Sequence, residues 1–191
     1  ASAAPRLGRL MASALLLGIV ATAALFLASI GPRPDIATAA ETPRFLFKFV
    51  VALAVALPAV GVAWRLARPG RRPGVWGWLL VLSPVLLMLA VVGELFAVPQ
   101  ADWLTRLVGS NARHCLIVIP LLALAPLACL LFALRQGAAP RPRLAGGVAG
   151  LACGALAAVF YAANCPDDSP LFVAAWYPLA IGFVALLGAL L

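Results

Sequence analysis

The stretch Asn164-Cys165-Pro166-Asp167-Asp168-Ser169-Pro170 is the last strongly polar interval of the chain. It separates two apolar runs, each close to the roughly 20 residues that a helix needs to cross a bilayer core about 30 Å thick. The rest of the chain has the same character, with 65% hydrophobic and 10% charged residues among 191 and a mean hydropathy of +1.09. A soluble core cannot absorb so much apolar surface, so the sequence predicts an integral membrane protein.

The whole chain contains six apolar runs of spanning length. They cover residues 10–30, 45–64, 76–98, 115–134, 144–163 and 171–191. The runs are rich in Leu and Ala and lack the alternation of barrel strands, which favours helices. The predicted fold is therefore all-α: one polytopic domain, residues 1–191, with six transmembrane helices in three hairpins.

The charged residues between the runs indicate orientation. The net charge of +8 comes from short arginine clusters and not from a basic face, so we expect no nucleic-acid binding. The N-terminal stretch and the second and fourth loops carry Arg6, Arg9, Arg65, Arg68, Arg71, Arg72, Arg135, Arg141 and Arg143, and no acid. All six acids lie in or beside the other loops: Asp35, Glu41, Glu94, Asp102, Asp167 and Asp168. The positive-inside rule then predicts cytoplasmic termini and places Cys115 and Cys165 at the outer face.

Arg6 and Arg9 precede the first apolar run as in a signal peptide, but the run is too long for one and five more follow. We therefore expect a retained helix. Because the chain begins at Ala1 without Met and ends at Leu191 without a polar flank, we expect a fragment of a longer protein, one that lacks most of an N-terminal cytoplasmic segment.

The four cysteines fall into two groups. Cys129 lies about 21 Å along its helix from Cys115, at 1.5 Å per residue, and Cys153 is near mid-membrane, so both are expected to be packing residues. No C-x-x-C pair occurs, which argues against a thioredoxin-like centre or a zinc ribbon. Cys115 and Cys165 remain as a thiol pair at the outer rim.

The neighbours of the rim thiols predict different reactivities. Arg113 and His114 favour the thiolate of Cys115, whereas Asp167 and Asp168 disfavour that of Cys165. We therefore expect Cys115 to be the better nucleophile. With His114, Asp167 and Asp168 in support, Cys115 and Cys165 also offer ligands to a thiophilic metal ion bound transiently. A plain structural disulfide between them fits the residues equally well.

Other side chains predict helix packing and helix starts. Gly146, Gly150 and Gly154 recur every four residues and form a smooth groove for another helix. Lys48 and Glu94 lie at similar depth, so they either pair or extend separately to the interface. Thr42-Pro43 and Ser169-Pro170 are typical helix starts, with a capping hydroxyl followed by proline.

The chain resembles the NrsF family in four motifs. They are Gly31-Pro32-Arg33-Pro34-Asp35, Pro43-Arg44-Phe45-Leu46-Phe47-Lys48, Gly109-Ser110-Asn111 followed by Cys115-Leu116, and Cys165-Pro166-Asp167-Asp168-Ser169-Pro170-Leu171-Phe172 followed by Trp176-Tyr177. The resemblance implies a six-span protein of the bacterial inner membrane that negatively regulates extracytoplasmic-function (ECF) sigma factors. It also implies that Cys115 and Cys165 sense heavy-metal or oxidative stress. The cytoplasmic N-terminal segment is expected to contact the sigma factor, and only residues 1–9 represent it here.

Two other classes of protein remain as alternatives. A small transporter needs a polar cavity or broken helices near the midplane, and the inner thirds of these runs have few polar side chains. A membrane thiol oxidoreductase needs a second reactive pair, for which Cys129 and Cys153 are poorly placed. We therefore expect a regulator and not an enzyme, with a sigma factor and the lipid bilayer as partners, no resident cofactor and no small-molecule substrate.

Overall fold

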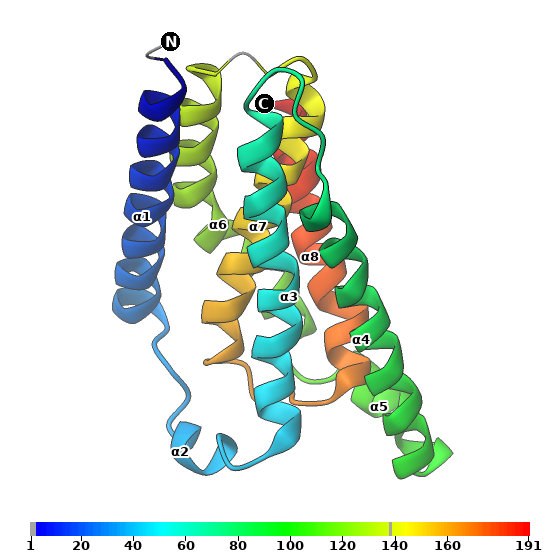
Figure 1. The fold of residues 1–191 in the computed structure, drawn as a ribbon. Helices are drawn as coiled ribbons and strands as arrows, with labels where there is room; N and C mark the ends of the chain where they lie inside the picture. The colour runs from blue at the N-terminus through cyan, green and yellow to red at the C-terminus, as the bar shows by residue number, and fades with distance from the viewer. Residues whose placement is uncertain (1–2, 138) are drawn as a thin grey trace.

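The computed structural model describes residues 3–137 and 139–191, and this part of the chain is helical and without strands (Figure 1). The elements in order are α1 (Ala3–Ser29), α2 (Ile36–Ala39), α3 (Pro43–Leu66), α4 (Val75–Ala97), η1 (Gln100–Asp102), α5 (Trp103–Val108), α6 (Ala112–Arg135), α7 (Pro142–Ala162) and α8 (Pro170–Leu190). Six of them, namely α1, α3, α4, α6, α7 and α8, are long and apolar enough to cross a membrane. The predicted all-α, six-span fold class is confirmed.

The helix starts follow from their capping residues. The Thr42 hydroxyl accepts a hydrogen bond from the Phe45 amide at 3.4 Å, and Pro43 is the first residue of α3. The Ser169 hydroxyl accepts from the Leu171 amide at 3.3 Å, and Pro170 is the first residue of α8. Each side chain satisfies an amide that the helix itself leaves free. Both predicted starts are confirmed.

Helix α7 lies at the centre of the bundle, packed against α3, α6 and α8, while α1 packs mainly on α6. Its small residues allow this position. A Cβ added at Gly146 would meet the Gly188 carbonyl, and one at Gly150 would meet the Val184 carbonyl. A Cβ at Gly154 would lie 3.2 Å from Ile181 Cα, so the backbones diverge slightly there. The three glycines therefore let α7 and α8 approach almost backbone to backbone.

The contact between α1 and α6 depends on a proline. Pro126 lies inside α6 and has no N–H, so the Leu122 carbonyl loses its normal partner. The Thr22 hydroxyl shares its hydrogen bond between that carbonyl, at 3.2 Å, and the Gly18 carbonyl of its own helix, at 2.9 Å. Gly18 faces Pro126 so closely that an added Cβ would lie 2.6 Å from Pro126 Cα. The neighbouring helix thus satisfies the group that the proline frees.

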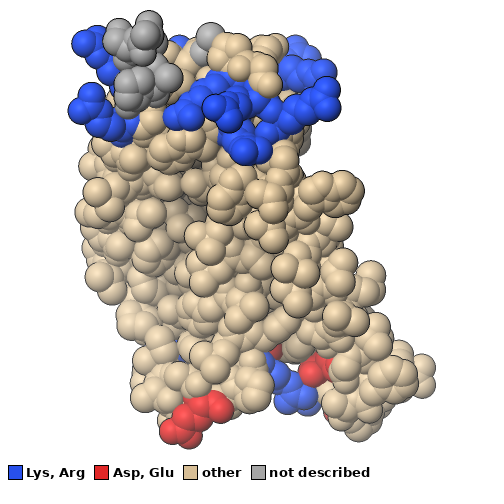
Figure 2. Space-filling view, viewed as in Figure 1, with Lys and Arg blue, Asp and Glu red and all other residues tan. Residues whose placement is uncertain are grey.

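The charged side chains lie at the two ends of the bundle (Figure 2). One end, which we call the arginine-rich end, carries both termini, the α3–α4 loop and the α6–α7 loop (Figure 1). Its loops and flanking turns bear Arg65, Arg68, Arg71, Arg72, Arg135, Arg141 and Arg143. All six acidic residues belong to the opposite end, with α2, α5 and the α7–α8 loop, and we call this the cysteine end.

Candidate functional site

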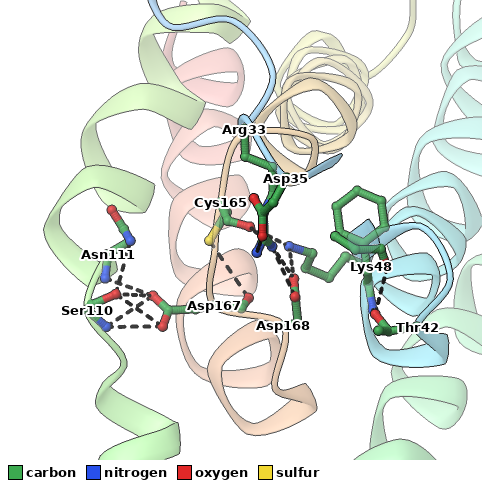
Figure 3. Close-up of polar contacts among 11 residues, drawn as sticks. Arg33, Asp35, Thr42, Lys48, Ser110, Asn111, Cys165, Asp167 and Asp168 are labelled. Carbon is green, nitrogen blue, oxygen red and sulfur yellow. Dashed lines mark hydrogen bonds and ion pairs between the residues drawn. The ribbon is translucent and has the colours of Figure 1, made fainter. Parts of the chain in front are cut away.

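The α7–α8 loop, residues 163–169, contacts segments from most of the other elements at the cysteine end (Figure 3). The loop is short and is closed by backbone bonds: the amides of Asn164 and Cys165 both donate to the Tyr161 carbonyl, at 2.9 and 3.0 Å. Ser169 then begins α8. Cys165 is therefore fixed between a helix end and a helix start, and its side chain is fully buried.

Asp167 connects this loop to the start of α6. Its carboxylate accepts hydrogen bonds from the Ser110 amide at 3.0 Å and from the Asn111 amide at 2.8 Å, and it also accepts from the Ser110 hydroxyl. Asn111 makes no side-chain cap of its own, so Asp167 supplies the negative group that a helix N-terminus favours. Cys115 lies in the first turn of α6, and its amide donates to the Asn111 carbonyl at 2.8 Å. Asp167 thus links the segments that carry the two thiols.

Gly109 makes that link sterically feasible. Its φ is +61°, a backbone conformation that favours glycine. An added Cβ would meet the Phe172 ring and would lie 2.9 Å from Asp167 Cγ. The chain before α6 therefore passes directly over the start of α8 and beside the capping carboxylate.

Asp168 connects the same loop to α3 and to the α1–α2 loop. Its carboxylate lies 2.6 Å from Lys48 Nζ and 3.0 Å from Arg33 Nη1. Lys48 is fully buried, donates to the Cys165 carbonyl at 2.8 Å, and places Nζ 5.0 Å from the Phe45 ring centroid. Arg33 also forms a two-bond pair with Asp35. That pair lowers the pKa of Asp35 and raises that of Arg33.

We call this connected set the polar cap (Figure 3). It consists of Arg33, Asp35, Lys48, Ser110, Asn111, Asp167 and Asp168. Two cations face two carboxylates around Asp168, so this part of the cap is balanced in charge. Balance matters because each unpaired ion in a low-dielectric setting costs several kcal/mol, on the order of 3–5 when one partner of a pair is lost.

Lys48 and Glu94 neither pair with each other nor extend separately to the interface. Lys48 pairs with Asp168, and Glu94 pairs with Arg44 and Arg106, at 3.0 and 3.3 Å, and accepts from the Ser169 hydroxyl at 3.2 Å. Depth alone suggested the Lys48–Glu94 pair, but depth does not say which side of a helix a residue faces. Both charges are buried and each has its own partners.

The two rim thiols lie together beneath the polar cap. Cys115 and Cys165 are both fully buried, belong to the same buried core cluster, and are free of disulfide bonds. Tyr161 contacts this pair, and its hydroxyl donates to the Asn111 carbonyl at 3.4 Å. The Tyr177 hydroxyl is buried nearby without a hydrogen-bond partner in the described part of the chain. The expected position at an open outer surface is corrected: the thiols are at that end but sealed from solvent.

The predicted difference in reactivity also needs correction. Arg113 and His114 are exposed, whereas Cys115 is buried, because successive helix residues point about 100° apart. The His114 ring stacks near Tyr161, with centroids 6.5 Å apart. Burial is the largest of the effects that raise the pKa of the Cys165 thiol. The charge of Lys48 lowers this pKa, whereas the charge of Asp167 raises it, as predicted. The adjacent cations in the sequence therefore give no support for a thiolate at Cys115.

The remaining predicted residues lie elsewhere. Cys153 is buried within α7, and Cys129 is partly buried in α6. Among residues 3–137 and 139–191, no three His, Cys, Asp or Glu side chains are gathered so as to hold a metal ion. Asp167 and Asp168 are already occupied by amides and cations, so a metal ion at Cys115 and Cys165 would need the polar cap to open.

Sequence reasoning missed several residues of the site. Arg33, Ser110 and Asn111 stand in motifs that were noted only as signs of resemblance, and their contacts with Asp168 and Asp167 link distant loops. Tyr161 ends an apolar helix and gave no signal. A weak signal existed for Lys48, since a buried lysine in a membrane helix requires an acidic partner.

The fold and the site define a polytopic helical membrane protein with two free thiols buried beneath a charge-balanced polar cap. The chain belongs to the NrsF family, described as negative regulator of sigma F, whose sequence model matches residues 1–191. It is 32% identical over 191 residues to a probable anti-sigma-F factor NrsF from Azospira oryzae, covering 98% of this chain and 88% of that protein. It is 35% identical over 175 residues to the anti-sigma-F factor NrsF of Caulobacter vibrioides, covering 90% and 81%. No solved structure matches the chain.

Proposed function

We propose that this protein is a membrane-bound anti-sigma factor of the bacterial inner membrane that holds an ECF-type sigma factor at its cytoplasmic face. Both relatives are anti-sigma-F factors by name, and they match this chain over most of their length. The proposal further assigns the signal to Cys115 and Cys165 at the periplasmic face. The observation that carries this assignment is the burial of both thiols together, on segments that Asp167 connects.

The orientation rests on charge. The arginine-rich end carries no acidic residue, as expected for the cytoplasmic side, whereas the cysteine end is close to neutral. The sigma factor then contacts the arginine-rich end, including the N-terminal stretch before Arg9. Alkaline phosphatase inserted after Asp35 should be active and the same insertion after Gly70 inactive; the reverse pattern would overturn the orientation.

The chemistry of the signal follows from the two thiols. An oxidant removes two electrons and two protons from Cys115 and Cys165 as one disulfide forms, whereas a thiophilic metal ion displaces one proton from each sulfur. Either event replaces two buried neutral groups with a bond or an ion. A signal crosses the membrane only if the modified pair favours a different arrangement of α6 relative to α7 and α8. The sigma factor is released in that arrangement.

A sigma-dependent reporter tests the proposal. Cys115→Ser, Cys165→Ser and the double variant should lose the response to cadmium or chromate to similar extents, because the thiols act as one unit. Cys129→Ser and Cys153→Ser are the matched controls and should respond normally. Immunoblots of membranes check that each variant is present. A full response in the double variant would leave the pair as a structural feature, and failure to co-purify the sigma factor with the parent would refute the anti-sigma role.

A further inference from the structure

A groove lies between α1 and α3, with Leu156 of α7 as its floor. It arises because α1 packs mainly on α6 while α3 packs mainly on α7. The groove has a volume of about 700 Å³, within the roughly 300–1,000 Å³ typical of ligand pockets. Leu15 and Ile19 line one wall, Leu53 and Leu57 the other, and Leu156 the floor. The interior is thus apolar and suits a hydrocarbon chain.

The groove has the length and the mouth of a lipid site. From Leu53 to Arg65 the α3 wall extends about 18 Å at 1.5 Å per residue, slightly more than the hydrocarbon of one leaflet, about 15 Å. Trp64 and Trp76 line it near its mouth, where amphipathic rings favour the headgroup region. The groove therefore opens at the arginine-rich end at headgroup depth.

Basic side chains surround that mouth (Figure 2). Arg68 and Arg71 line both the groove and an adjoining pocket of about 390 Å³, which Arg72 and Arg141 also line. No acidic residue of the described chain lies at this end, so protein carboxylates do not neutralise these charges. The Arg68 Nε is buried and has no hydrogen-bond acceptor among the described residues. A buried guanidinium N–H without an acceptor indicates that an anionic group from outside the chain completes this site.

We propose that this groove and its basic mouth bind one anionic phospholipid of the surrounding bilayer. An acyl chain lies along Leu53 and Leu57, and the phosphate accepts hydrogen bonds from Arg68 and Arg71. Guanidinium groups bind phosphate oxygens by paired, charge-assisted bonds, and basic pockets between helices on the cytoplasmic side suit such headgroups. The inference does not depend on sigma-factor binding or on the thiols.

The groove favours a lipid over an acidic protein segment. A peptide in the apolar part would have to bury backbone amides and carbonyls that no residue there can satisfy, whereas an acyl chain has no such groups. Only the outermost part, around Arg71 and Arg72, is open to a peptide carboxylate. A phospholipid therefore accounts for both the apolar lining of the groove and the arginines at its mouth.

Tryptophan quenching tests the proposal, because Trp64 and Trp76 line the groove. The purified protein is placed in phosphatidylcholine nanodiscs that contain either dibrominated phosphatidylglycerol or dibrominated phosphatidylcholine at the same low mole fraction. Phosphatidylglycerol should reach half-maximal quenching at a mole fraction at least fivefold lower. Native mass spectrometry of the same protein should retain one phosphatidylglycerol.

Paired variants give the decisive comparison. Arg68→Gln/Arg71→Gln should lower the fivefold preference to less than twofold, whereas Arg9→Gln/Arg135→Gln removes two exposed charges from the same end and should keep it. Equal quenching of the parent by both lipids, or equal loss in the two double variants, would overturn the proposal. Displacement of the retained lipid by a short polyglutamate peptide would instead identify an acidic protein segment as the occupant and would also overturn it.

Discussion

Lys48 Nζ lies 2.6 Å from Asp168 Oδ1 and 2.8 Å from the carbonyl oxygen of Cys165, so one buried ammonium group ties α3 to the loop that carries a thiol. This connection is made by charge and not by apolar packing. A buried ammonium is tolerated only when acceptors surround it, and here the carboxylate, the carbonyl and the Phe45 ring do so. The position of the Cys165 loop is therefore sensitive to single changes in this group.

Lys48→Met should destabilise the protein by about 3 kcal/mol, the lower part of the range for breaking a buried ion pair. The loss stays in that part because Arg33 still faces Asp168. Titration of the purified protein with SDS in mixed micelles measures the free energy of unfolding. Arg113→Met, an exposed cation at the same end, should change it by less than about 0.5 kcal/mol. A Lys48→Met variant as stable as the parent would show that the ammonium lies outside the polar cap.

The Cys165 thiol should react slowly at neutral pH and accelerate well into the alkaline range. Burial raises its pKa above the ordinary 9.0, so its thiolate fraction should still be rising at alkaline pH values where that of an ordinary thiol has levelled off. The measurement is iodoacetamide alkylation of a variant with Cys115, Cys129 and Cys153 changed to Ser. The same variant unfolded in SDS serves as control and should level off near the ordinary value. A folded-state rate that levels off there too would contradict the prediction.

Gly150→Ala should weaken the α7–α8 contact, because even one methyl group would meet the Val184 carbonyl. We expect a loss of about 1–3 kcal/mol, as for other overpacked interiors. Gly182→Ala on α8 is the matched control, since an added Cβ there meets no atom within 4 Å, and it should be neutral or slightly stabilising. Thermal unfolding in detergent distinguishes the two variants. Similar midpoints for both would mean that α7 and α8 lie further apart.

Thr22→Val should lower stability by about 0.6 kcal/mol, the average for hydrogen bonds between membrane helices. The substitution keeps the shape of the side chain and removes the only hydroxyl that reaches the Leu122 carbonyl among the described contacts. Ser13→Ala, which removes an exposed bond within α1, should have a smaller effect. SDS titration again measures the difference. A larger effect from Ser13→Ala would assign the α1–α6 contact to something other than this hydroxyl.

The sequence alone predicts the membrane helices, because a run of about 20 apolar residues has few other stable outcomes. It also predicts the starts at Thr42 and Ser169, where local capping chemistry is sufficient. It places Lys48 and Glu94 at similar depth, and Asp168 in the loop before the last helix. It does not say which of them face each other, since the rotation of each helix about its axis depends on packing between segments more than 100 residues apart.

The candidate site shows the same division between local and distant effects. That Cys115 and Cys165 lie at one end follows from counting spans. That Arg113 faces outward while Cys115 faces Tyr161 does not, because neighbours in a helical sequence are not neighbours in space. The hydrogen bonds from the Ser110 and Asn111 amides to Asp167 cannot be predicted from the sequence either. No sequence pattern indicates that the capping group of one helix comes from a loop 56 residues away.

The close fit of Gly18 against Pro126 limits how α1 can move. Sliding α1 along its axis by four residues, about 6 Å, would bring Ala14 or Thr22 to the position of Gly18, where a Cβ would lie 2.6 Å from Pro126 Cα. Because Arg6 lies twelve residues, or about 18 Å, beyond Gly18, each degree of tilt displaces it sideways by about 0.3 Å. A tilt of α1 about Gly18 would therefore displace the N-terminal arginines sideways.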